Sequence, residues 1–203
     1  MLTWQILILT QPSRAAMLEQ LTRCLYRQFD AVAEDRIETL VWDFDKKLSL
    51  GENREAMRQA AKADYISFFD DDDLPAPDYV ETISPLLDGR DYIGHQLQGY
   101  RDCAPMKMTY NSLQFPGWYE DAKGYYRHIS HICPIRRDLA LRVAMEGGFG
   151  EDCRWAEALR KLGIVQTEHV INKVMYHYLW RQLKNDRHDA FDARRMALLR
   201  NNP

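Results

Sequence analysis

The chain has 203 residues, with 27 basic and 30 acidic side chains and a formal net charge of −3. Its 46% hydrophobic and 28% charged residues are typical of a globular protein and exclude a disordered or fibrous one. The opening apolar run, residues 6–9, is far shorter than the roughly 20 residues that cross a bilayer. We therefore expect a cytoplasmic protein without a transmembrane segment. The slightly acidic balance argues against a protein that binds DNA mainly through its phosphates.

The first part of the chain alternates between apolar strand patterns and amphipathic helix patterns. Ser49 and Glu52 have the spacing of a capping box, which marks the start of a helix. Crossover helices between nearly continuous apolar strands predict a parallel sheet with helices on its faces. The patterns predict strands over residues 2–10, 37–42 and 65–69, and helices over residues 12–29, 49–61 and 78–87.

The second part is richer in aromatic and turn residues. We expect strands over residues 92–100, 125–135 and 164–178, and helices over residues 137–145, 152–162 and 190–199. His128 and His131 fall within the second of these strands, where sheet packing is the expected role. No repeat or linker divides the sequence. We expect one domain over residues 1–203, made of a first half (1–90), a second half (91–181) and a C-terminal tail helix (182–203).

Four consecutive aspartates, residues 70–73, directly follow the apolar strand Tyr65–Phe69. In open α/β sheets, ligands bind beyond the carboxyl ends of the strands. Carboxylates this close repel one another unless a cation neutralises them, and Mg²⁺ or Mn²⁺ prefers oxygen ligands together with substrate phosphates. The run therefore predicts a metal site for a phosphorylated ligand. Its structural alternative is a solvated acidic turn that caps the next helix.

Two parts of the sequence resemble a known family. Residues 53–56 (Asn-Arg-Glu-Ala) and residues 63–74, which end in the aspartate run, are similar to the nucleotide-sugar half of GT-A glycosyltransferases, in particular family 2. Residues 132–137, followed by Gly-Gly-Phe-Gly-Glu-Asp at 147–152, are similar to that family's acceptor-side strand and acidic ED motif. The resemblance covers most of residues 2–181. It implies a three-layer α/β/α fold with a mostly parallel sheet and a small mixed β region on the acceptor side.

The resemblance also implies roles for the aspartates. Asp72 would hold Mn²⁺ or Mg²⁺ against the diphosphate of the donor, and Asp70 would contact the donor's ribose or sugar or share the metal. Asp71 and Asp73 are ambiguous because the run is longer than the D-x-D motif, so the register can shift by one. His177 is a further candidate metal ligand, although a histidine in an aromatic strand is more often a packed residue.

Five other residues are candidate contacts to the nucleotide. Asp43 or Asp45 follows the second strand, where the family places an acid against the nucleobase. Arg54 matches the arginine that helps to hold the nucleotide. Thr10 ends the first strand, where it would contact the base or cap a helix, and Arg181 could clamp the diphosphate.

Asp152 is the candidate general base, because inverting transfer needs a carboxylate that takes the proton of the attacking hydroxyl. Glu151 would position the acceptor or serve as the base instead. Acids also favour helix N-termini, so both could simply stabilise the helix that starts there.

Together these residues predict a metal-dependent inverting glycosyltransferase that uses a nucleoside-diphosphate sugar, for which we expect a UDP-sugar. The acceptor hydroxyl could belong to a glycan, a lipid-linked glycan, a protein or a modified nucleic-acid base, and the acceptor would be bound by residues 91–149. An oligomer is compatible with the sequence. Two alternatives stay open: a metal-dependent phosphoryl-transfer enzyme or nuclease that uses the aspartates, and a non-catalytic α/β module that binds Ca²⁺.

Overall fold

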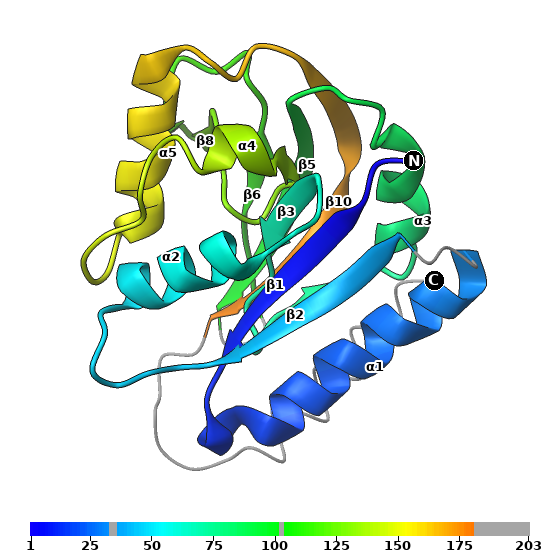
Figure 1. Cartoon of the computed structure of the whole chain (residues 1–203). Coiled ribbons are helices and arrows are strands. Elements are labelled where there is room, and N and C mark those ends of the chain that lie inside the picture. Colours follow the sequence, from blue (N-terminus) through cyan, green and yellow to red (C-terminus); the bar gives the residue numbers. More distant parts are fainter. Residues whose placement is uncertain (33–35, 102–103, 181–203) are drawn as a thin grey trace.

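The computed structural model describes residues 1–32, 36–101 and 104–180 (Figure 1). Within these residues, ten strands form a single sheet in which eight strands follow the order β2-β1-β3-β9-β5-β6-β8-β7. Strand β10 pairs with β5 and β4 beside this path. The predicted tail helix and Arg181 lie outside the described residues. None of the helices in the described part of the chain combines the length and the apolar character needed to cross a membrane.

The parallel core predicted for the first half is confirmed. Strand β1 (Trp4–Thr10) pairs in parallel with β2 (Ile37–Asp43) on one side and with β3 (Tyr65–Phe68) on the other. Helices α1 (Ala15–Val32) and α2 (Leu50–Ala60) make the crossovers between them. Because the three strands run the same way, their carboxyl ends meet at one edge of the sheet.

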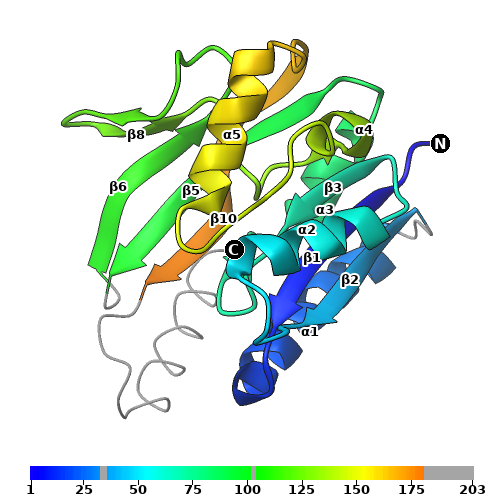
Figure 2. The same ribbon diagram turned by 60° about the vertical axis from the view of Figure 1, so that its left-hand side comes forward.

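Helices cover both faces of this sheet. Helix α1 packs with α3 (Tyr79–Ile83) on one face, and α2 packs with α5 (Glu151–Leu162) on the other (Figure 2). The predicted capping box starts α2, since the Glu52 N–H donates to Ser49 Oγ and the Ser49 N–H donates to Glu52 Oε2 at 2.7 Å. The architecture is therefore the three-layer arrangement that the sequence predicts.

The second half departs from the prediction in several places. The expected strand over residues 125–135 is wrong: β8 (Gly124–Arg127) ends early, and a buried loop leads to the short β9 (Ile135–Arg136). A turn in which the Cys133 N–H donates to Ser130 O, together with Pro134, interrupts the strand. The expected helix over residues 137–145 is only the single turn α4 (Arg137–Ala140).

The sequence patterns did not predict some of the strands, because these strands are short or lie among turn residues. Strand β6 (Ala104–Asn111) pairs antiparallel with β5 (Tyr92–Arg101), which was expected, and continues the sheet towards β8. Strands β4 (Leu74–Pro75) and β7 (Tyr119–Glu120) have two residues each. The long last strand, β10 (Glu168–Trp180), runs parallel to β5.

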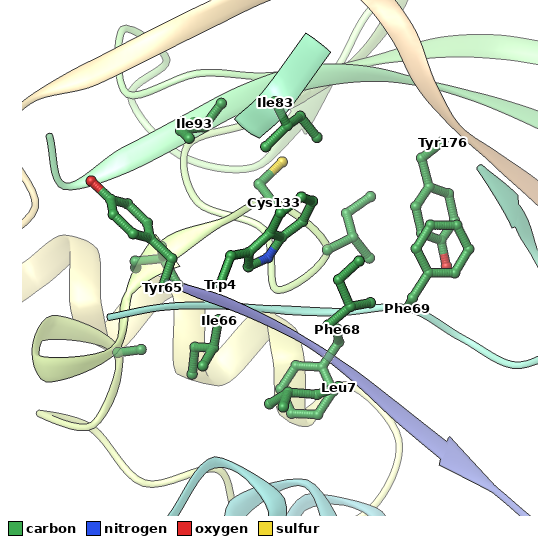
Figure 3. Packing of buried hydrophobic residues seen from close by; sticks show 14 of the residues in the cluster. Trp4, Leu7, Tyr65, Ile66, Phe68, Phe69, Ile83, Ile93, Cys133 and Tyr176 are labelled. Carbon is green, nitrogen blue, oxygen red and sulfur yellow. The ribbon is translucent and has the colours of Figure 1, made fainter. Parts of the chain in front are cut away.

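An aromatic core fixes the end of β3 relative to the rest of the sheet. The Phe69 ring stacks on Tyr176 of β10 at 4.3 Å (Figure 3). It also packs nearly perpendicular to the Tyr79 ring of α3. Trp4 of β1 packs against the same Tyr79 ring and donates its indole N–H to Ser67 Oγ at 3.0 Å. The residues that follow Phe69 therefore start from a rigid, fully packed position.

Helix α2 approaches the loop before α5 so closely that only glycine fits. The Gly51 N–H donates to the Gly147 carbonyl at 2.8 Å, and a Cβ at Gly51 would lie 2.6 Å from the Glu146 carbonyl carbon. Backbone atoms cannot move aside as a side-chain tip can. The contact joins the start of α2 to the loop that leads into α5.

We predict that Gly51→Ala lowers the free energy of unfolding by about 1–3 kcal/mol, the usual penalty for overpacking. Gly148→Ala is the matched control, because a Cβ there meets nothing within 4 Å and its φ is not positive. This control should stay within about 0.5 kcal/mol of the wild type. Urea unfolding of both variants measures the difference, and equal stabilities would contradict the close approach.

Candidate active site

The aspartate run lies where the parallel strands end. Thr10, the last residue of β1, pairs with Asp43, the last residue of β2, and its hydroxyl donates to Asp71 Oδ2 at 2.7 Å. The structure thus brings three of the predicted site residues to one edge of the sheet. This is the edge at which open α/β sheets bind their ligands.

Two of the four aspartates are buried and accept hydrogen bonds from neighbouring elements of the fold. Asp71 accepts from Thr10 and also from Arg14 Nη1 at 2.7 Å. Asp73 accepts the Tyr176 hydroxyl proton at 2.7 Å and the Leu179 N–H at 2.7 Å, so it anchors β10 to the run. These contacts leave Asp71 and Asp73 turned away from solvent.

The other two aspartates, Asp70 and Asp72, keep an open side. Asp70 accepts from Arg54 Nη2 at 2.7 Å, and its side chain is 33% exposed. Asp72 is 27% exposed and lies 3.5 Å from Arg14 Nη1. Burial, together with the Asp70 and Asp71 carboxylates, raises the pKa of Asp72, while Arg14 opposes the shift. An alternating pattern of open and buried side chains therefore matches a D-x-D register at residues 70 and 72.

Among the described residues, no three His, Cys, Asp or Glu side chains are arranged to hold a metal ion by themselves. Mg²⁺ commonly binds one or two carboxylates and completes its shell with water and substrate phosphates. Asp72, with Asp70 beside it, fits that kind of site, because a cation would offset the burial and the carboxylate repulsion that together raise the pKa of Asp72. His177 pairs with Leu74 and packs 6.0 Å from the Tyr100 ring, and the described residues do not group it with the two aspartates.

Arg54 joins the two motifs of the site. Its guanidinium is buried, donates to both Asp70 and Glu151, and lies 5.3 Å above the Phe68 ring. Two carboxylates that are far apart in sequence therefore share one cation. The predicted contact of Arg54 with the nucleotide stays a prediction, and the structure adds the role of holding these carboxylates in place.

The acidic pair at the start of α5 divides into one buried and one accessible carboxyl. Glu151 is 2% exposed, and burial raises its pKa against the opposing effect of Arg54. Asp152 is 19% exposed, and its Oδ1 accepts the Cys153 N–H at 2.8 Å. Burial favours a higher pKa for Asp152, but His131 and Arg54 outweigh it and lower the pKa. Asp152 is thus the more accessible carboxyl of the pair and the one whose pKa is lowered.

The comparisons with known proteins agree with this geometry. The family model described as "Glycosyl transferase family 2" matches residues 25–143, more than half of the chain. The chain belongs to glycosyl transferase family 2. No curated protein matches it.

Solved structures of TarS from S. aureus share the fold. The chain superposes on TarS 1–349 with a TM-score of 0.61 at 12% identity, covering 87% of this chain and 60% of that one. A complex of TarS 1–349 with UDP-GlcNAc gives the same TM-score and identity and covers 90% of this chain. The chain thus spans about 60% of the length of TarS 1–349. The likeness shows that this family 2 protein has the GT-A fold.

Other expected site residues have different surroundings. Asp45 shapes a turn, since its Oδ1 accepts the Lys47 N–H at 2.9 Å and its own N–H donates to Asn53 Oδ1 at 2.8 Å. Asp43 is exposed at the end of β2. The nucleotide contacts proposed for both residues stay predictions.

Sequence reasoning missed two residues that contact the candidate site. Arg14, in the 3-10 turn Pro12–Arg14, lies against Asp71 and Asp72, and its place just after the first strand was an available signal. His131 was expected to pack within a strand. It instead lies in the buried loop, with Nδ1 3.3 Å from Asp152 Oδ2. No sequence pattern predicts that contact.

We predict that Arg54→Met lowers the free energy of unfolding by about 3–5 kcal/mol, because it leaves two carboxylates without their cation. The pKa of buried Glu151, already raised in the folded state, should rise further, so ionising it costs more stability as the pH increases. The loss should therefore be larger at pH 8 than at pH 5, as measured by urea unfolding. Adding Glu151→Gln to Arg54→Met should recover part of the lost stability at pH 8. A loss of stability that does not depend on pH would contradict its origin in the broken ion pairs.

Proposed function

We propose that this protein is an inverting glycosyltransferase that moves a sugar from a nucleoside-diphosphate sugar to an acceptor hydroxyl. Membership of family 2 supports the reaction class. The observation that carries the proposal is the pair of contacts made by Arg54, because its buried guanidinium donates both to Asp70 of the candidate D-x-D pair and to Glu151, the neighbour of the candidate base Asp152. One site then holds the groups needed for the donor and for the acceptor.

The proposed donor is a UDP-sugar. TarS, which shares the fold, has been solved with UDP-GlcNAc and with UDP. In this chain the nucleotide would lie at the edge formed by Thr10, Asp43 and the aspartate run. Arg14, half-exposed beside Asp72, is placed to contact a diphosphate at that edge.

Asp72 and Asp70 would hold Mn²⁺ or Mg²⁺ together with the donor diphosphate. The cation supplies charge stabilisation for the diphosphate that leaves. Asp152 takes the proton of the acceptor hydroxyl as that oxygen bonds to the anomeric carbon, and the bond between this carbon and the diphosphate oxygen breaks. Glu151, held by Arg54, keeps the start of α5 in position for this step.

The alternatives find no such support. A two-metal phosphoryl-transfer site needs carboxylates gathered around paired ions. In the part of the chain that the structure describes, the aspartates are instead paired with Arg14, Arg54, Thr10 and Tyr176. The same contacts give no preformed oxygen cage for Ca²⁺.

We predict that the cation and the nucleotide bind together. Mn²⁺ alone should leave the melting temperature unchanged, whereas Mn²⁺ with UDP should raise it more than UDP alone, because bound ligand stabilises the fold by mass action. Asp72→Asn should abolish the extra shift due to Mn²⁺. Asp138→Asn, on an exposed acid paired with Arg136 at the surface, is the control that should keep it. A shift with Mn²⁺ alone, or one that Asp72→Asn retains, would argue against this site.

We predict that Asp152→Asn separates chemistry from binding. UDP release from UDP-sugars, with water in place of the acceptor, should fall by about 10²–10⁴-fold, the usual contribution of a general base. The affinity for UDP should stay within about 3-fold, since Asp152 does not contact the proposed nucleotide edge. Titration calorimetry measures the affinity and a coupled assay measures the release. Release at the wild-type rate would exclude Asp152 as the base.

A further inference from the structure

The loop that replaces the expected strand after β8 is buried and firmly held. The Phe68 N–H of β3 donates to the His131 carbonyl at 2.8 Å, and the Ser130 N–H donates to the Tyr92 hydroxyl at 3.2 Å. Ile129, Ser130 and Cys133 are fully buried. His131 thus sits on a rigid support at the carboxyl end of β3, next to the aspartate run.

The His131 side chain is buried against the candidate base. It is 8% exposed, its ring packs 5.9 Å from the Phe68 ring, and Nδ1 lies 3.3 Å from Asp152 Oδ2. Within the described residues, neither ring nitrogen makes a hydrogen bond of good geometry. A buried polar group without a settled partner destabilises the fold, so such groups tend to occur where function needs them. Catalytic hydrogen bonds are often long before substrate binds and shorten in the complex.

We propose that His131 is a positioning residue for Asp152: its neutral imidazole donates the Nδ1–H to Asp152 Oδ2 and orients the carboxylate. This inference rests on the proposed function, in which Asp152 is the base. The other carboxylate oxygen, Oδ1, accepts the Cys153 N–H at 2.8 Å. Both oxygens are then fixed, and the exposed part of Asp152 keeps a lone pair available for the acceptor hydroxyl.

Burial favours the neutral form of the His131 imidazole, and the charges around it act in both directions. Arg54 of α2 and Arg127 of β8 lower the pKa of the imidazole. Asp152 and Asp70 raise it. Burial is the largest effect and lowers the pKa of His131, with the two guanidinium groups acting in the same direction. A neutral imidazole has one N–H, so its tautomer decides whether it can donate to Asp152.

The tautomer can be read directly by NMR on the full chain with ¹⁵N-labelled histidine. The His131 signals, identified by their loss in His131→Asn, should show a protonated Nδ1 and an unprotonated Nε2 at neutral pH. Asp152→Ala should remove this preference. An Nε2–H tautomer in the wild-type protein would overturn the proposal, whatever the activity of the protein.

Two substitutions of similar size give the functional test. His131→Asn keeps an N–H donor near the position of Nδ1, whereas His131→Gln moves it to the position of Nε2. The rate of UDP release from UDP-GlcNAc should stay within about 3-fold of the wild-type rate in the Asn variant and fall at least about 10-fold in the Gln variant, because a displaced base loses part of its 10²–10⁴-fold contribution. The KM for the donor should be unchanged in both variants.

The pH profile separates positioning from packing. Without the Nδ1–H donor the pKa of Asp152 should rise, so the acidic limb of the rate profile should move to higher pH in the Gln variant and stay in place in the Asn variant. Equal effects of the two substitutions, or none, would overturn the proposal. A wild-type protein that releases no UDP from any UDP-sugar, with Mn²⁺ or Mg²⁺ present, would contradict the proposed function instead. The tautomer would still decide the His131–Asp152 contact.

Discussion

The arrangement of the site depends on one buried cation, the Arg54 guanidinium. It lies between Asp70, which follows β3, and Glu151, which starts α5, and these residues are 81 positions apart in a chain of 203. A buried charge of this kind is tolerated only with good partners, and the removal of one partner leaves another uncompensated. The pairing therefore fixes α5, and with it Asp152, relative to the end of the sheet. The close contact between Gly51 and Gly147 joins the start of α2, one turn before Arg54, to the loop that leads into α5.

The arginines around the site do not balance its acids. Arg14, Arg54 and Arg127 face five carboxyl groups at the edge of the sheet and the start of α5: Asp70, Asp71, Asp72, Glu151 and Asp152. A donor diphosphate brings further negative charge to this edge. Its binding is then favourable only if positive charge arrives with it, because like charges at this range repel strongly in a partly buried site. This charge balance is the physical basis for the proposed cation at Asp72 and for the prediction that the cation binds together with the nucleotide.

The sequence predicted the first half well because its signals are local. The apolar strands, the capping box at Ser49 and the aspartates after Phe69 can each be recognised within a few residues. The second half depends on contacts between distant residues, and there prediction was weaker. Strand β6 lies among aromatic and turn residues, and the strand expected through His131 is a buried loop. Arg14 and Asp71 are 57 residues apart, so their contact follows from the order of the strands and not from any motif.

The four aspartates show how burial divides identical residues into different roles. Asp71 and Asp73 are held by β1 and β10, and they in turn hold Asp70 and Asp72 at the surface with little freedom to move. Charged groups that are fixed before the substrate arrives stabilise a transition state without the cost of reorganising them. Because Tyr176 and Leu179 of the last strand contact the same run that Thr10 of the first strand contacts, the site is complete only when both halves of the chain have folded together. The placement of the four aspartates thus depends on the whole sheet, although they are adjacent in the sequence.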